Sequence, residues 1–216
     1  MSLQGIINTA SNIEVTRQEV VAQTVTRSGR IYTGRRDTVK PWQFKVTPAD
    51  VYPWSIARPA LEGIMLKDRY EESTISFSVS GQAWMFAYQG ALSASELTNN
   101  VAITGVSNRT ITATISGTVL SKASTDLIFA SGDIIQPLQN THRYPYVVTE
   151  NVTRGSVSTI SIPIHRDVIG SVTGGGFRAG ASCEFKVIVT SLPSYTYMPG
   201  QLIQFTGDFQ LLENVI

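Results

Sequence analysis

The sequence has little of what several protein classes require. Only 15% of its 216 residues are charged and the formal net charge at pH 7 is +1, so no strong field draws the chain toward nucleic acid or an acidic membrane. The single cysteine, Cys183, excludes an intrachain disulfide. No apolar run approaches the roughly 18 residues that span a bilayer, and residues 1–5 lack the basic and apolar segments of a secretion signal. These absences predict a soluble protein that is made inside the cell.

What the sequence does contain favours β-structure. Hydrophobic residues make up 42% of the chain, which is too apolar for disorder, and serine, threonine and glycine are plentiful. A chain of this length can hold one domain, or one domain with a sizeable insertion, around a real core.

The clearest β pattern lies in residues 181–216. Apolar side chains recur at every second position over residues 183–190 and again over residues 201–211, with polar side chains between them. This alternation predicts two half-buried strands, antiparallel neighbours joined by a turn-rich connection at 192–200. The thiol of Cys183 falls on the apolar face and is expected to be buried and inert. The apolar positions are Cys183, Phe185, Val187, Val189, Ile203, Phe205, Phe209 and Leu211.

A second alternating pattern lies near the start of the chain. Residues 13–26 predict one strand of a long β-hairpin and residues 42–47 predict its return strand, with turns at 28–29 and 34–37. Six cations and one acid stand between residues 27 and 45. This basic tip either contacts a partner or is a solvated edge whose cations oppose aggregation. The candidate contact residues are Arg27, Arg30, Arg35, Arg36 and Lys40.

One helix is predicted after this hairpin. Apolar residues at helical spacing indicate a helix over residues 58–70, with Ser55 as a plausible N-cap and Pro59 in the first turn. Residues 74–79 and 83–89 then predict a second β-hairpin with its turn at 80–82.

The middle of the chain changes in character. Residues 93–100 are polar and are expected to form a linker or a single helical turn. Short threonine- and isoleucine-rich segments follow, and residues 170–180 hold five glycines that predict a flexible loop. Strands so short and evenly spaced favour a small barrel or sandwich. We expect them at 101–106, 110–116, 126–130, 134–138, 144–149 and 158–164.

The simplest organisation is one β domain formed by residues 1–92 and 181–216, with a small β domain inserted over residues 93–180. A long N-terminal hairpin, one helix, a second hairpin and a returning terminal hairpin resemble the tail-tube fold of tailed bacteriophages. The closest resemblance is to distal tail and baseplate-hub ring proteins, which carry an extra small β domain. It is architectural and spans most of the chain.

That resemblance implies a six-membered ring in which strands of neighbouring subunits complete a barrel around a DNA channel. Channel walls in the family are often acidic, whereas the hairpin tip here is basic. The five candidate cations are therefore expected to contact another ring instead of lining the channel.

Catalytic and metal-binding constellations are weak by comparison. His142, His165, Cys183 and either Asp133 or Asp167 could be drawn as a nucleophilic set, but no Gly-x-Ser-x-Gly elbow is present. The lone cysteine and two histidines have no zinc-ligand spacing. Residues 174–177 lack the lysine and following helix of a phosphate loop. Structural roles are the expectation for all of these residues.

Tyrosines offer one alternative function. Tyr144, Tyr146, Tyr195 and Tyr197 would suit a sugar or a partner protein if they were exposed, although half-buried positions are commoner for such residues. A host-surface glycan-binding module of the tail tip is therefore the rival hypothesis.

Together these patterns predict an all-β protein with one helix, a tail-tube-like sandwich or barrel carrying an inserted small barrel. The expected function is structural, in a tail tube or baseplate hub of a virion, with no enzymatic activity, cofactor or metal. The expected partners are further copies of the chain in a ring, other tail and baseplate proteins, and genomic DNA that passes without sequence-specific binding. No membrane partner is expected.

Overall fold

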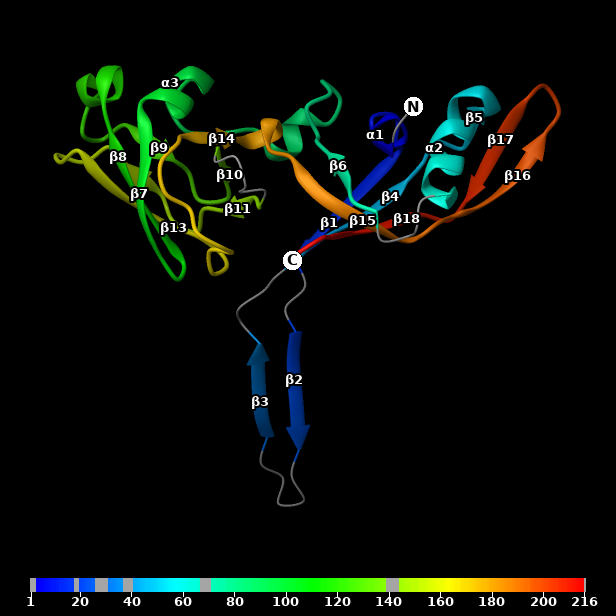
Figure 1. Cartoon of the computed structure of the whole chain (residues 1–216), viewed down its shortest axis with the longest axis horizontal. Coiled ribbons are helices and arrows are strands. Elements are labelled where there is room, and N and C mark those ends of the chain that lie inside the picture. The colour runs from blue at the N-terminus through cyan, green and yellow to red at the C-terminus, as the bar shows by residue number, and fades with distance from the viewer. Residues whose placement is uncertain are drawn as a thin grey trace. The chain divides into compact units, whose positions relative to one another are not determined.

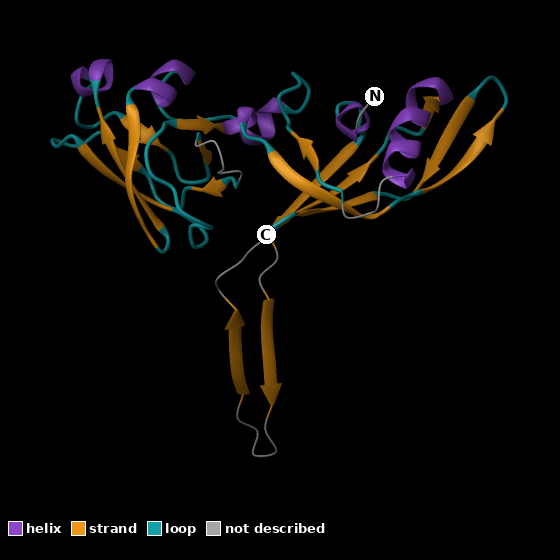
Figure 2. Cartoon of the chain, viewed as in Figure 1, coloured by secondary structure: helices purple, strands orange, loops and turns teal. Residues whose placement is uncertain are grey.

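The computed structural model describes residues 3–17, 20–25, 31–36, 41–66, 71–138 and 144–215 (Figure 1). Most of its regular structure is in β-sheets (Figure 2). Among the described residues one helix is 13 residues long, and the other helical segments are shorter. The predicted all-β class with one substantial helix is confirmed.

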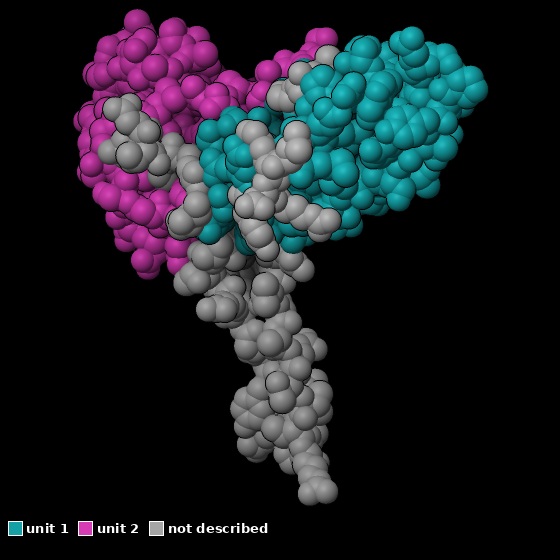
Figure 3. All heavy atoms as spheres, turned by 45° about the vertical axis from the view of Figure 1, so that its right-hand side comes forward, with its two compact units in different colours: residues 1–75, 186–216 teal, residues 76–185 magenta. Residues whose placement is uncertain are grey.

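The chain divides into two compact units, which Figure 3 colours separately. The first unit consists of residues 1–75 and 186–216, and the second consists of residues 76–185. The sequence pattern places the boundaries at 92/93 and 180/181. Residues 76–92 and 181–185 are therefore the ones that the two divisions assign differently.

A five-stranded sheet organises the first unit, and alternation along each strand sets its two faces. Trp42, Phe44 and Val46 are buried, while Gln43 and Lys45 between them lie on the opposite face. The two strands near the chain start pair with each other, and so do the first and last strands of the C-terminal stretch, as predicted. The order is β1 (Asn12–Arg17), β4 (Trp42–Thr47), β18 (Phe209–Glu213), β15 (Phe185–Ser191) and β6 (Ser73–Ile75).

The long N-terminal hairpin continues in a separate two-stranded sheet. Strands β2 (Val20–Val25) and β3 (Ile31–Arg36) pair antiparallel, from Val20 opposite Arg36 to Val25 opposite Ile31. The turn predicted at 34–37 is wrong for residues 34–36, which belong to β3, and residue 37 lies outside the described residues.

A three-stranded sheet and the main helix complete the first unit. Its order is β16 (Ser194–Met198), β17 (Leu202–Thr206) and β5 (Val51–Pro53). The predicted turn-rich connection at 192–200 is wrong, because β-favouring side chains between two prolines make most of it a strand. The strand predicted over 201–211 is divided by Gly207, whose φ of +100° turns the chain between β17 and β18.

The helix α2 (Trp54–Leu66) begins four residues earlier than predicted, and residues 67–70 lie outside the described residues. Ser55 is consequently inside the helix and is not its N-cap. The expectation that Pro59 lies in the first turn is also wrong, since it is the sixth helical residue. A proline there removes one backbone hydrogen bond at a cost of about 3 kcal/mol. Burial of Ala57 and Leu61 on the same helix offsets this cost. A short helix, α1 (Leu3–Ile7), buries Ile6 and Ile7.

The second unit contains the predicted series of short strands. Each of the six predicted strands coincides with a strand, and two more, β12 and β14, were not predicted. The three sheets have the orders β13-β8-β7, β11-β10-β14 and β12-β9. The bounds are β7 (Val101–Ser107), β8 (Thr110–Ile115), β9 (Leu127–Phe129), β10 (Ile134–Pro137), β11 (Tyr146–Val147), β12 (Val152–Thr153), β13 (Thr159–Pro163) and β14 (Phe177–Ala179).

The prediction of a second hairpin over residues 74–89 is wrong. The second hairpin is absent there: β6 ends at Ile75, and residues 83–86 form the 3₁₀-helix η1 (Ala83–Phe86). Phe77 packs its ring on Phe86 at 5.2 Å and on Phe185 at 5.9 Å, so the alternating aromatics build a cluster instead of a hairpin face. Of the two alternatives for residues 93–100, the helical one is confirmed, because the short helix α3 (Ala94–Asn99) is capped by Ser93 and buries Leu97.

The glycine-rich segment 170–180 is part of the packed structure and not simply a loop. It contains buried Val172 and ends in β14 and the 3₁₀-helix η3 (Gly180–Ser182). A Cβ on Gly176 would lie 2.3 Å from the carbonyl oxygen of Thr98, so only glycine permits this close approach. Another 3₁₀-helix, η2 (Gly117–Ser121), follows β8.

Candidate functional site on the open sheet face

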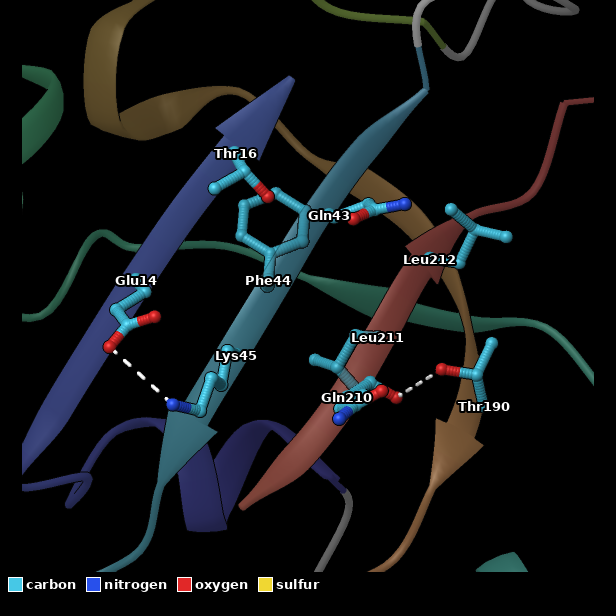
Figure 4. Close-up of a pocket in the computed structure, with 9 residues that line it drawn as sticks. All are labelled: Glu14, Thr16, Gln43, Phe44, Lys45, Thr190, Gln210, Leu211 and Leu212. Atoms are coloured by element: carbon cyan, nitrogen blue, oxygen red, sulfur yellow. Dashed lines mark hydrogen bonds and ion pairs between the residues drawn. The ribbon is translucent and has the colours of Figure 1, made fainter. Parts of the chain in front are cut away.

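The five-stranded sheet presents one buried face and one open face. Side chains that alternate with the buried ones form the open face, and Figure 4 shows several of them side by side on β1, β4, β18 and β15. The open face is mainly polar, with threonine hydroxyls, glutamine amides and ionised groups. Its central residues are Glu14, Thr16, Gln43, Lys45, Thr47, Thr190, Gln210 and Leu212.

A shallow hollow of about 290 Å³ lies on this face. The pairing of β15 with β18 shifts register between Val189 and Ser191, so Thr190 is the extra residue of a β-bulge. The hydroxyl of Thr190 donates to the carbonyl oxygen of Gln210 at 3.1 Å (Figure 4). The bulge therefore both shapes the hollow and satisfies a backbone acceptor at its rim.

Lys45 is the centre of a charge network on the open face. Its Nζ lies 3.3 Å from Oδ2 of Asp208 and 3.5 Å from Oε1 of Glu14. The hydroxyl of Thr47 donates to Oδ1 of Asp208 at 2.6 Å. The hydrogen bond with Asp208, and then the charges of Asp208 and Glu14, raise the pKa of Lys45. The Thr47 hydroxyl, and then Lys45, lower the pKa of Asp208.

This arrangement can bind but offers little for covalent chemistry. The side chains are hydroxyls, amides and ion-paired groups with pKa values displaced away from neutrality, whereas a general acid or base works best with a pKa near the working pH. Within the described ranges, no group of three or more His, Cys, Asp or Glu side chains could hold a metal ion. The open face is thus suited to noncovalent contact with a polar or hydrated surface.

The basic tip predicted from the sequence lies mostly outside the described residues. Arg27, Arg30 and Lys40 are not described. Arg35 and Arg36 are the last two residues of β3, opposite Val21 and Val20. Their role as inter-ring contacts stays a prediction.

The described residues of the nucleophilic set that was considered make structural contacts. His142 lies outside the described residues, and His165 accepts a hydrogen bond from the backbone N–H of Val147 through Nδ1 at 3.0 Å. Asp167 lies 3.3 Å from the Nε of Arg109.

Asp133 and Cys183 are buried. The Asp133 carboxylate accepts hydrogen bonds from the backbone N–H groups of Ala130 and Gln89, at 2.8 and 2.9 Å. Burial raises the pKa of the Cys183 thiol, and this thiol points at the carbonyl oxygen of Ile134. The prediction of a buried thiol is confirmed.

The tyrosines divide into two pairs. Tyr144 and Tyr146 are buried, which contradicts the idea that they are exposed ligand-binding rings. Their burial has a cause that periodicity cannot reveal: both rings lie against the guanidinium of Arg166, at 5.9 and 5.2 Å from its Cζ. Tyr195 and Tyr197 belong to β16 in the first unit, and Tyr197 is 64% exposed.

Sequence reasoning missed the network around Lys45. Alternation along β4 places Lys45 on the polar face, but Asp208 lies in the turn after Gly207, far away in the sequence. The only local signal was a Gly-Asp pair, which is typical of turns in general. The pairing of β4 with β18 was needed to bring the charges together.

Comparisons with known proteins add no relative, since no protein-family model and no curated protein sequence matches the chain. In the part of the chain that the structure describes, no helix has both the length and the apolar character needed to cross a membrane.

Proposed function

We propose that this chain is a ring-forming structural protein of a tailed bacteriophage, in the tail tube or baseplate hub. In this function the open face of the five-stranded sheet lines the channel through which DNA passes. The single observation that carries the proposal is this sheet itself. One of its faces is buried by the core of the first unit, while the other is open, mainly polar and continuous across four strands.

The edges of the sheet support assembly into a ring. Among the described strands, β1 and β6 stand at the two ends of the order and have one neighbour each. Unpaired strand edges expose backbone donors and acceptors that pair readily with another chain. Pairing of β1 in one copy with β6 in the next is a heterologous contact, and such contacts generate closed rings when the rotation closes.

The charges of the open face fit the passage of DNA without stable binding. Lys45 is the cation at the centre of the face, and two carboxylates, Glu14 and Asp208, lie against it. Phosphate binding in proteins depends on cations that are available to neutralise phosphates. A cation already neutralised by two acids contributes little, so a polyanion can move past this face.

A cysteine pair tests the ring directly. Glu14→Cys or Thr16→Cys in β1 is combined with Thr74→Cys in β6, and the protein is oxidised. The two edges of one sheet are separated by roughly 19 Å across four strand spacings, whereas a disulfide needs Cα atoms within about 7 Å. An intrachain disulfide is therefore excluded, and linkage between copies should give a ladder of covalent oligomers that ends at one closed size, expected to be the hexamer.

Each single-cysteine variant is the matched control and should give at most a dimer. Native mass measurement of the unmodified protein completes the test. A chain that stays monomeric at high concentration, and whose double-cysteine variants show no ladder, would overturn the ring.

The basic tip can be tested separately. Changing Arg30, Arg35 and Arg36 to glutamate should leave folding nearly intact, because the sequence predicts that they stand at the tip of a hairpin, where solvated charges contribute little to stability. Stacking of one ring on the next, scored in electron micrographs, should fail. Normal stacking with all three charges reversed would mean that the tip is only a solvated edge.

The glycan-binding alternative is weakened by the burial of Tyr144 and Tyr146, since both were among the rings on which it depended.

A further inference from the structure

The outer strand of the three-stranded sheet is an edge without the usual protection. Strand β16 stands at the end of the order β16-β17-β5, so among the described strands it pairs with β17 alone, and Figure 1 shows it on the outside of the hairpin. Its five residues, Ser194–Met198, include no charged side chain. Natural edge strands usually carry lysines or prolines, or are covered by another element, because bare edges pair with other chains.

The sequence around this edge is nearly symmetric. From residue 193 to residue 199 it reads Pro-Ser-Tyr-Thr-Tyr-Met-Pro, with Thr196 at the centre. A tyrosine stands one position away on each side, and a proline stands three positions away on each side. Proline has no backbone N–H and cannot continue a ladder. The two prolines therefore limit any added pairing to the residues of β16 itself.

The aromatic side chains of this edge are only partly covered. Tyr195 packs against Phe205 at 6.2 Å, whereas Tyr197 is 64% exposed although it lies 5.1 Å from the ring of Trp54. The two tyrosines contact each other edge to face at 5.8 Å. Both lie on the same side of the strand, because side chains two residues apart share a face. An added strand would cover this apolar surface with its own alternate side chains.

We propose that β16 pairs antiparallel with β16 of a second copy of this chain, about a two-fold axis at Thr196. In this register Tyr195 of each copy lies opposite Tyr197 of the other, and Thr196 lies opposite its equivalent. Aromatic–aromatic and Thr–Thr cross-strand pairs both stabilise antiparallel sheets. The two sheets join into one six-stranded sheet, with three strands from each copy.

The symmetry of the segment selects this register. A shift by one residue places the tyrosines of the two copies on opposite faces. A larger shift leaves fewer paired residues or brings a proline into the ladder. The contact is isologous, since the same surface serves both copies. It is separate from the proposed ring, which uses the edges of the five-stranded sheet and heterologous contacts.

Self-disulfide formation at the axis is the test. In the proposed dimer the two Thr196 Cα atoms lie about 4.5–5.5 Å apart, which is within disulfide range. The full-length Thr196→Cys variant should therefore form a covalent dimer on mild oxidation. Ser194→Cys is the matched control, because its two copies would be roughly 13 Å apart along the strand. We expect Thr196→Cys to dimerise at least about tenfold faster than Ser194→Cys. Buried Cys183, 1% exposed, does not compete.

The register has its own positive control. The double variant Ser194→Cys with Met198→Cys should regain rapid dimer formation, because residue 194 of one copy lies opposite residue 198 of the other. All three positions have exposed side chains, so the substitutions disturb little of the core. Equal rates for Thr196→Cys and Ser194→Cys would indicate random collision and overturn the proposal. A slow double variant would overturn it as well.

A charge substitution tests the contact without a disulfide cross-link. Thr196→Lys places two like charges opposite each other at the axis, which destabilises a cross-strand pair, so the non-covalent dimer should be lost by native mass measurement. Gln204→Lys is the control, because Gln204 is exposed on the same face but lies on the central strand β17 opposite Thr196. Retention of the dimer by Thr196→Lys would overturn the proposal.

The results of these experiments distinguish a failure of the β16 dimer from a failure of the proposed ring. Thr196→Lys should leave the covalent ladder between β1 and β6 unchanged if both inferences hold. A ladder without the Thr196 disulfide overturns the β16 dimer alone, and a Thr196 disulfide without the ladder overturns the ring alone.

Discussion

The two compact units differ in where they keep their polar groups. In the second unit, several polar side chains lie in the interior and bond to the backbone of the same unit: the Gln136 amide bonds to both the N–H and the carbonyl of Glu184, and Asp133 accepts hydrogen bonds from two backbone N–H groups. In the first unit, polar side chains gather on an open sheet face around Lys45, with Glu213 as a buried exception. The second unit thus holds part of its polar groups in its interior, whereas the first unit presents them on an open sheet face.

This difference bears on which unit the proposed ring would use for its contacts. Buried polar groups that find partners within their own unit fix a unique core and leave nothing for a neighbour. An open sheet face has the opposite property, because its side chains can still be paired from outside. If the proposed ring forms, we expect its contacts in the first unit, and we expect the second unit to fold as a self-contained body.

Removal of the last two strands should break the first unit completely. Ile203, Phe205, Phe209 and Leu211 are buried, at roughly 1.5–3 kcal/mol each, or about 6–12 kcal/mol together. A domain is stable by only about 5–15 kcal/mol in total. Truncation after Gly200 should give insoluble protein, also because β18 lies between β4 and β15 and its loss exposes both.

The matched truncation removes only residues 214–216 and should be tolerated. It leaves every residue of β18 in place and costs the two hydrogen bonds of Asn214. Soluble yield and a thermal melt of both proteins are the measurements. A truncation at Gly200 that melts near the full-length temperature would mean that the terminal strands are an appendage.

A core substitution in the second unit sharpens the comparison. Phe129 is fully buried and its ring packs edge to face on Phe177 at 5.8 Å and on Tyr88 at 6.1 Å. Phe129→Ala should cost about 3–5 kcal/mol. Only the melting transition of the second unit should move in calorimetry, while Val157→Ala, at a 61% exposed position, should move neither. If both transitions fall together, the units share one folding core.

A smaller effect is expected at the start of α3. Ser93 caps this helix: its hydroxyl accepts from the N–H of Glu96, and its own N–H donates to the Glu96 carboxylate at 2.8 Å. Loss of such a cap costs about 1 kcal/mol, so Ser93→Ala should lower the stability of the second unit by about that amount. Thr98→Ala, in the same helix but away from the cap, is the control.

The cap also predicts a dependence on pH. The backbone N–H of Ser93, and then its hydroxyl, lower the pKa of Glu96 to about 2 from the ordinary 4.5. A carboxyl with a lowered pKa stabilises the folded state above its unfolded pKa, and this contribution is lost as the pH falls toward the folded value. Stability of the second unit should therefore decline between pH 4.5 and about 2, and less so in Ser93→Ala. An identical decline in both proteins would contradict the assignment.

The sequence reveals the sheets better than it reveals the site. Alternation around Phe44 and Phe185 was sufficient to predict buried strands, because one face of each strand is buried. The same alternation around Phe77 misled, since those rings pack on a 3₁₀-turn. The burial of Tyr146 could not be predicted for a related reason. The side chain that covers its ring belongs to Arg166, which is distant in the sequence and is not indicated by any local periodicity.

Contacts on the open face depend on which strands become neighbours. Lys45 could be placed on a polar face from the sequence, but its two acids come from β1 and from the turn before β18. Strand order is a property of the whole chain and is not encoded in any short stretch. The position of β16 at a sheet edge could not be predicted from its own sequence for the same reason. Only that position suggests that its symmetric sequence pairs with a second copy.

The smallest loss of stability is expected from Lys45→Ala. The size of this loss distinguishes an open face that contributes little to folding from a charge network that stabilises the fold. Lys45 and Glu14 are about half exposed, with side-chain exposures of 45% and 54%, and exposed ion pairs contribute little to stability. In the full-length Lys45→Ala variant, the melting temperature of the first unit should fall by less than that of the second unit falls in Ser93→Ala. This decrease should vanish at about 1 M salt, where the screening length is only about 3 Å.

The same network predicts a dependence on pH. The raised pKa of Lys45 stabilises the folded state below the ordinary value of 10.5, and this stabilisation is lost as the pH rises through the folded pKa. The lowered pKa of Asp208 stabilises the folded state above 3.8, and this stabilisation is lost as the pH falls through the folded pKa. The difference in stability between the variant and the parent should therefore be fully present between pH 3.8 and pH 10.5 and should be lost as the pH moves through the folded pKa on either side. Lys186→Ala, which removes a cation bonded to Thr74 on the same sheet, is the control. A large, salt-resistant loss in Lys45→Ala alone would mean that the open face stabilises the fold and would remove the contrast between the two units.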